Sequence, residues 1–348
     1  MASYLTNGEA LGAAYATMAF FFVAAITVAM TPSFRQRFSG SFDSFLAARG
    51  TMGAFKTGVS FFAGAMGAWV VYGVPEVGTL LGPWGIMGYS LSLVIPYVGV
   101  AWLAPRLTRV VPNGFTALDF AQKRYGNVMY YFTLLVSIFY LFIFLVAEYS
   151  AAGGAVSAMT NYTLGDSTGN GWQVTLGVAL ISAAYTAFGG LAVSIFTDLF
   201  QGIIVFLLII IGCIAGFANS STTSKAVEDA AQWTDAGFGS LITLVLALTG
   251  AAAFDQSLWQ RAYAAKDSKT LWKASGIACM FIVPVTIIFG IAGIVGRAEF
   301  PEDSLAVSPA QSPPCYPHGP VLSSSEGPRA PDSLGMGCRG RKISRMEH

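Results

Sequence analysis

The chain has 348 residues, of which 54% are hydrophobic and only 11% are charged, and its formal net charge is +1. This composition lies far outside the range of soluble globular domains and predicts an all-α polytopic membrane protein with the lipid bilayer as its surroundings. A nearly neutral chain without a clustered basic surface excludes nucleic acid as a partner.

Apolar runs between polar breaks mark the candidate membrane spans, because about 20 apolar residues rising about 1.5 Å each cross a hydrocarbon core. The first run lacks the basic start of a cleavable signal, so we expect it to remain as a membrane helix. The eight runs are Ala10 to Met30, Thr57 to Val74, Pro83 to Ala104, Val128 to Met159, Trp172 to Phe188, Ile195 to Phe217, Phe238 to Ala253 and Leu271 to Val295.

The distribution of basic residues predicts the orientation, since cytoplasmic loops retain positive charge. With the N-terminus outside, the outer loops before Val295 hold only Lys225. The sequons Asn161-Tyr162-Thr163 and Asn219-Ser220-Ser221 also fall outside. We therefore expect a multi-pass protein of the plasma membrane with an outer N-terminus. The inner segments would hold twelve basic residues, Arg35, Arg37, Arg49, Lys56, Arg106, Arg109, Lys123, Arg124, Arg261, Lys266, Lys269 and Lys273.

The C-terminal segment differs in character from the rest. Residues Glu299 to His348 hold eight of the 15 prolines, many serines and no apolar run. Such a segment cannot bury a core. The sequence thus predicts a transmembrane domain over residues 1–297 and a disordered, proline-rich tail over residues 298–348.

The second run has an unusual centre. Within SFFAGAMGAWVVYG (Ser60 to Gly73), the middle reads Ala-Gly-Ala-Met-Gly-Ala. One interpretation is close helix packing through small residues. The other is an interrupted helix whose freed backbone groups line a solvated cavity.

Two carboxylates lie in apolar surroundings, where an unpaired charge is costly. Asp198, in GGLAVSIFTDLFQG, is expected to line a polar path, pair with a cation or sit at the interface. Glu148 lies well inside the fourth run, so either it takes up a proton or it faces a wet cavity. The segment AFDQSLWQRAYAAKD, Ala253 to Asp267, reads as an ordered inner gate or a basic interfacial anchor.

Four motifs together resemble the sodium/solute symporter family, and they occur in that family's order between Asp43 and Val295. GGLAVSIFTDLFQ resembles the signature after its fifth helix, and FDQSLWQRAYAAKD resembles its Asp-Gln-x-x-x-Gln-Arg segment. FTALDFAQKRYG resembles the short loop before the family's long helix, and DSFLAARG resembles the inner loop ahead of its broken helix.

The resemblance implies a LeuT-type inverted-repeat bundle in which substrate and ion bind where helices unwind near the midplane. The first repeat would be complete and the second truncated, so we expect a C-terminally truncated relative of the family. Na⁺ or H⁺ would be the coupling ion, with no other cofactor or metal. The implied cation-binding residues are Ala63 and Met66, through their carbonyl groups, and Asp198. The implied substrate-binding residues are Gly64, Gly67, Trp69, Thr249 and Glu148.

These observations predict a secondary active transporter for cation-coupled symport of a small polar solute. The seventh run is apolar apart from Ser240, Thr243 and Thr249, so it lacks the polar groups that a sugar requires. The DQxxWQRA form resembles the urea-transporter branch, which favours urea or a small amide. A monocarboxylate, an amino acid and a truncated non-transporting remnant are the alternatives. An enzyme is not expected, because the only histidines, His318 and His348, lie in the tail and no paired aspartates occur in facing runs.

Overall fold

The computed structural model describes residues 7–31, 42–160, 171–220, 222–231 and 233–299. The predicted tail and the sequon at Asn161 lie outside these residues. The chain divides into two units, Met1–Val307 and Ser308–His348, and the description below concerns the first. Its elements are α1 Asn7–Met30, α3 Phe42–Ala47, α4 Ala54–Ala65, α5 Val70–Val110, α6 Ala117–Tyr125, α7 Asn127–Thr160, α8 Gly171–Asn219, α9 Ser224–Ala230, α10 Asp235–Ala252, α11 Gln256–Ala264 and α12 Ser268–Glu299.

Helices form in all eight predicted apolar runs, and α5 and α8 each extend across a kink from one run into the next. Four helical stretches in the described part are long and apolar enough to cross a membrane, namely 70–110, 127–155, 189–218 and 268–299. A fifth candidate span is a bent pair, 237–252 with 256–264, whose halves meet at 62°. Two shorter apolar helices cover 15–28 and 175–184. These helices make the protein a multi-pass membrane protein.

Two glycines with positive φ bend the merged helices. Gly82 in α5 has φ 61° and ψ −154°, and Gly190 in α8 has φ 62° and ψ −164°. Residues with a Cβ rarely adopt this conformation, so glycine permits each sharp change of direction. Each kink coincides with the boundary that the sequence places between two apolar runs.

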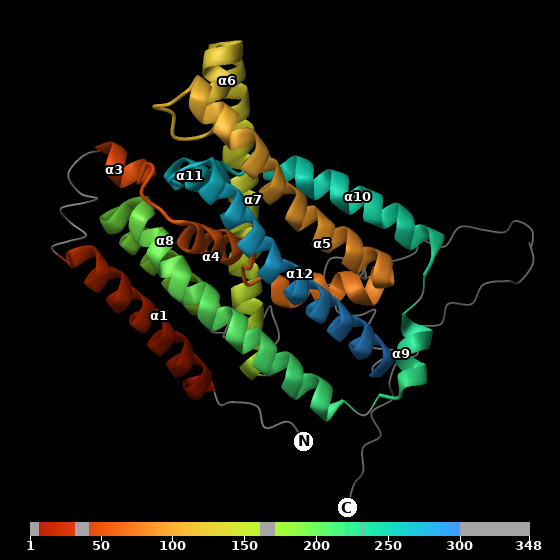
Figure 1. Cartoon of the computed structure of the whole chain (residues 1–348). Coiled ribbons are helices and arrows are strands. Elements are labelled where there is room, and N and C mark those ends of the chain that lie inside the picture. The colour runs from red at the N-terminus through yellow and green to blue at the C-terminus, as the bar shows by residue number, and fades with distance from the viewer. Residues whose placement is uncertain (1–6, 32–41, 161–170, 221, 232, 300–348) are drawn as a thin grey trace, which may run out of the picture. The chain divides into compact units, whose positions relative to one another are not determined.

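The core forms where α12 packs along α5 and α4, while α10 packs on α5 and α8 packs on α4 and α1 (Figure 1). Small residues allow α5 and α12 to approach closely, because a Cβ on Gly78 would overlap the carbonyl oxygen of Gly290. The buried side chains include Phe61 and Phe62 of α4 and Ile282 of α12. This packing fixes α4 on both sides just before its last turn, where the candidate site begins.

Candidate functional site

The predicted weak centre of the second run is a break in the helix. Helix α4 ends at Ala65, and α5 begins at Val70. The N–H of Met66 donates to Phe62 O at 3.0 Å and more weakly to Ala63 O at 3.3 Å. Within the described residues, no backbone N–H outside the helix donates to the carbonyl of Gly64. The break therefore leaves weakly bonded carbonyl oxygens at the C-terminal end of α4, the negative end of its dipole.

A carboxylate from another helix satisfies the opposite end of the break. Glu148 of α7 accepts a hydrogen bond at Oε2 from the backbone N–H of Ala68, at 2.7 Å, and the N–H of Trp69 also interacts with this carboxylate. In a continuous helix the N–H of Ala68 would donate to Gly64 O. Glu148 thus caps the start of α5 from another helix, α7, and its carboxylate faces the positive end of the α5 dipole.

Gly67 makes this contact possible. A Cβ built on Gly67 would overlap Oε1 of Glu148. Because φ of Gly67 is not in the left-handed region, the requirement is for space rather than for backbone freedom. Gly67 and Glu148, both predicted as substrate-binding residues, are therefore brought together as one structural unit.

A cavity of about 290 Å³ opens beside the break, between α5, α7 and α10. Its wall includes Gly64 and Trp69, as the sequence predicts for a substrate site, together with several further aromatic rings. Trp69 and Tyr89 lie with ring centroids 5.6 Å apart. The other lining residues are Ala65, Ser92, Leu93, Pro96, Tyr97, Tyr140, Phe144, Ala147, Leu248, Ala251, Ala252, Asp255 and Leu258.

Two residues of the wall carry polar groups that bear on solute binding. The indole Nε1 of Trp69 is buried and has no hydrogen-bond partner among the described residues. Asp255 is the one ionisable acid of the lining, and its Oδ1 caps α11 by accepting from the N–H groups of Ser257 and Leu258 at 2.9 and 3.4 Å. These bonds use one oxygen of the carboxylate, so Asp255 retains acceptor capacity at Oδ2.

An ion pair lies next to the break, on its α4 side. Asp198 Oδ2 of α8 accepts from Arg261 Nη2 of α11 at 3.0 Å and from the hydroxyl of Ser60 of α4 at 2.5 Å. Ser60 Oγ in turn accepts from Arg261 Nε at 2.8 Å. The two charged side chains are only 12% and 13% exposed. The triad joins three helices that are distant in sequence, and the guanidinium also lies 3.8 Å from the Cβ position of Gly64.

Of the eight predicted site residues, only Gly64 and Trp69 line the cavity. The other six, Ala63, Met66, Gly67, Glu148, Asp198 and Thr249, are not part of its wall. The carboxylate of Asp198 pairs with Arg261, one of the three outcomes that its surroundings allow, and its role as a cation ligand stays a prediction. Glu148 contacts the break but does not line the cavity, whose wall receives Tyr140, Phe144 and Ala147 from the same helix, α7. The hydroxyl of Thr249 is buried without a partner among the described residues and is not part of the wall.

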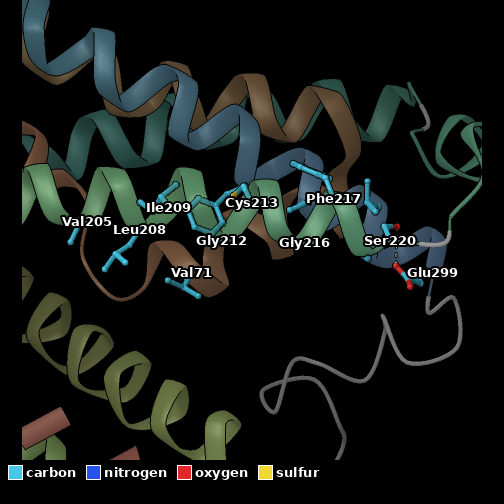
Figure 2. Close-up of a pocket in the computed structure, with 14 residues that line it drawn as sticks. Val71, Val205, Leu208, Ile209, Gly212, Cys213, Gly216, Phe217, Ser220 and Glu299 are labelled. Atoms are coloured by element: carbon cyan, nitrogen blue, oxygen red, sulfur yellow. Dashed lines mark hydrogen bonds between the residues drawn. The ribbon is translucent and has the colours of Figure 1, made fainter. Parts of the chain in front are cut away.

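A larger groove of about 550 Å³ is lined by α8, the end of α12 and Val71 of α5. Figure 2 shows its apolar side chains along α8, with the polar atoms confined to one end, where Ser220 Oγ donates to Glu299 Oε2 at 3.1 Å. A polar solute would find few partners along this groove. The smaller cavity at the break is therefore the candidate solute site.

The sequence is similar to a known family of transporters and to several of its members. The model of the sodium:solute symporter family matches residues 45–311. A spermidine transporter of Candida albicans is 28% identical over 74% of this chain and 49% of its own length. The high-affinity proline transporter of Bacillus subtilis is 29% identical over 56% of this chain and 41% of its own. A sodium/myo-inositol cotransporter of Sus scrofa is 25% identical over 54% of this chain and 26% of its own.

A solved structure has the same fold. The substrate-bound, outward-open Na⁺-coupled sialic acid symporter superposes with a TM-score of 0.67 at 16% identity, covering 86% of this chain and 63% of the symporter. This match confirms the predicted LeuT-type helical bundle. The chain spans about half the length of the curated relatives it matches. Because the family model covers most of the chain, this protein belongs to the sodium:solute symporter family and thus to a class of transporters rather than enzymes.

Proposed function

We propose that this chain provides the ion and substrate site of a cation-coupled symporter, with Na⁺ as the coupling ion. The observation that carries the proposal is the break at Met66–Trp69, which leaves carbonyl oxygens of α4 without strong donors. Oxygen atoms are the ligands that hard cations prefer. The carbonyls of Ala63 and Met66 are the proposed Na⁺ ligands, and the family membership supports the choice of ion.

We further propose that the solute presents N–H donors. The carboxylate of Asp255 can accept from such donors, and the indole of Trp69 can donate to an acceptor on the same solute. A volume of about 290 Å³ accommodates a small molecule. Urea fits this pattern, since it carries both N–H groups and a carbonyl oxygen. A monocarboxylate fits it poorly, because its charge would repel that of Asp255.

An organic cation is the second candidate, and the composition of the wall favours it. Asp255 is the one charged residue among those that line the cavity, and aromatic rings surround it. The faces of Trp and Tyr rings attract ammonium groups, most strongly when water is displaced. One relative is named as a spermidine transporter, and others are named as proline transporters, whose substrate has an amine.

Uptake of labelled urea, spermidine and proline into transporter-deficient cells tests the proposal. We expect saturable uptake of one of them that is lost when Na⁺ is replaced by choline. A version extended by the later helices of a full-length relative runs in parallel. Uptake that is indifferent to Na⁺ in both versions would contradict the proposal. Absence of uptake by both at equal surface expression would favour the non-transporting alternative.

Asp255→Asn separates a neutral solute from a cationic one. Asparagine caps helices as well as aspartate does, so the start of α11 is retained while the charge is lost. For spermidine we expect the half-saturating concentration to rise about 10- to 100-fold, whereas urea should change much less. Asp267→Asn, at the exposed cap of α12, is the matched control and should leave both values unchanged.

A further inference from the structure

A second, polar cleft lies at the other end of α5. Its volume is about 400 Å³, and it lies between the last turns of α5, the segment after α11 and the start of α12. Three of its lining residues are cationic, Arg49, Arg109 and Lys266, and one, Asp267, is acidic. The cleft shares no lining residue with the cavity at the break.

Backbone hydrogen bonds hold one wall of the cleft in place. The N–H of Met52 donates to Ala264 O at 3.0 Å, and the N–H of Lys266 donates back to Met52 O at 3.1 Å. The N–H of Gly50 donates to Tyr263 O at 3.2 Å. These bonds join two segments that are more than 200 residues apart in sequence, so the basic residues they carry have fixed relative positions.

Arg49 is fixed more tightly than a surface arginine usually is. Its Nη1 donates to Pro112 O at 2.7 Å and to Gly114 O at 2.8 Å. Its guanidinium carbon lies 5.5 Å from the ring centroid of Phe115 and 5.4 Å from that of Tyr263. This arrangement places a permanent positive charge in the wall of the cleft.

The cations of the rim are accessible. Arg109 and Lys266 are exposed, and neither forms an ion pair with any residue that the structure describes. The hydroxyl of Ser268 also lines the cleft and adds a donor, whereas the hydroxyl of Thr108 already donates to Pro105 O at 3.2 Å. The acid of the lining, Asp267, accepts a hydrogen bond from the N–H of Thr270 at 2.6 Å, so its lone pairs are partly used within the protein.

The cleft lies where two candidate membrane spans reach the interface. α5 ends at Val110, and α12 begins at Ser268. Trp102 is 55% exposed, and the guanidinium of Arg106 lies 4.1 Å from its ring centroid. Trp272, one turn into α12, is 47% exposed. Exposed tryptophans and arginines at helix ends mark the boundary between hydrocarbon and headgroups.

We propose that this cleft binds the phosphate of an anionic phospholipid headgroup. The fixed Arg49 and the free ends of Arg109 and Lys266 supply charge-assisted donors to phosphate oxygens. The sequence places this end of the bundle on the cytoplasmic side, where anionic lipids reside and where a basic pocket between helices suits their headgroups. The acyl chains would extend along the exposed apolar faces of α5 and α12.

Native mass spectrometry of the purified chain in mild detergent tests the site with dioleoyl phosphatidylglycerol and dioleoyl phosphatidylcholine at equal concentrations. We expect preferential retention of one phosphatidylglycerol. The double variant R109Q/K266Q should weaken this retention about 20- to 30-fold, since each interfacial cation contributes about fivefold. R109K/K266R, which keeps both charges, should retain the lipid.

Lys269→Gln is the matched control, because this exposed lysine is at the same end of the bundle but does not line the cleft. It should leave the retention unchanged. Equal retention of the two lipids, or a loss with K269Q as large as with the double variant, would overturn the proposal. Displacement of the lipid by inorganic phosphate at millimolar concentration would overturn the assignment to a lipid in favour of a soluble anion.

Discussion

The contact between Gly67 and Glu148 allows a sharp test of how the helix break is built. In Gly67→Ala the new methyl group would occupy the position of Oε1 of Glu148. The carboxylate must then move and release the N–H of Ala68, which it holds at 2.7 Å. Overpacking of this kind costs about 1–3 kcal/mol, and an unsatisfied backbone donor costs about 1–3 kcal/mol. We expect a clear loss in the free energy of unfolding.

The double variant with Glu148→Ala isolates the cause. Glu148→Ala alone removes the charge-assisted hydrogen bond and should lower the free energy of unfolding by about 1–3 kcal/mol. Once the carboxylate is gone, the methyl group introduced by Gly67→Ala has no oxygen to displace, so this change should add little further loss. The two changes should therefore be non-additive by about 1–3 kcal/mol.

Unfolding in mixed detergent micelles, followed by helical circular dichroism, measures the free energy of unfolding of the parent chain, the two single variants and the double variant. Gly99→Ala combined with Glu148→Ala is the control, because a Cβ on Gly99 meets nothing within 4 Å. That control pair should be additive. Additivity of the Gly67 pair, within the error of the measurement, would refute the interpretation of Gly67 as the space that Glu148 requires.

Two further changes probe other parts of the core. Asp198→Asn should leave the guanidinium of Arg261 without its counter-charge and lower the free energy of unfolding by about 3–5 kcal/mol. It should also lower the affinity for Na⁺, which titration with the ion would measure. Unchanged values for both quantities would contradict the role of the ion pair. Gly78→Ala should lower the melting temperature in a thermal unfolding assay, because its Cβ would overlap Gly290 O at the contact between α5 and α12. In Gly276→Ala the new Cβ meets nothing within 4 Å, so this control should be neutral or slightly stabilising. Equal melting temperatures for the two variants would contradict the close packing.

The sequence of the stretch left close packing and an interrupted helix as alternatives, and the resemblance to the symporter family favoured the break. Two glycines among alanines weaken a helix, and a spanning helix is interrupted only where other groups satisfy its backbone. The structure places the interruption at the C-terminal side of the stretch, from Met66 to Trp69. The same local reasoning placed boundaries between Val74 and Pro83 and between Phe188 and Ile195, and the backbone leaves helical geometry within these intervals, at Gly82 and Gly190.

The hydrogen-bond and ion-pair partners of the charged residues could not be predicted from the local sequence, because they depend on contacts between distant segments. Ser60 and Arg261 are 201 positions apart, and Ala68 and Glu148 are 80 apart. A signal for the second contact was present, since a carboxylate in an apolar run needs donors and a helix break supplies unpaired N–H groups. The face of α10 was also predictable in part: Leu248, Ala251 and Ala252 follow the helical period, and a neighbour such as Thr249 points about 100° away from that face.

The charges around the break support the proposal that the site binds a cation. A broken helix offers two ends, one rich in carbonyl oxygens and one rich in N–H groups. The protein occupies the N–H end with its own carboxylate, Glu148, and so leaves the carbonyl end of α4 open. The cation close to that open end is Arg261, which lies 3.8 Å from the Cβ position of Gly64 and is held by Asp198 and Ser60. An anion would therefore meet Glu148 and Asp255, whereas a cation would meet weakly bonded carbonyl oxygens and a guanidinium whose charge is already paired.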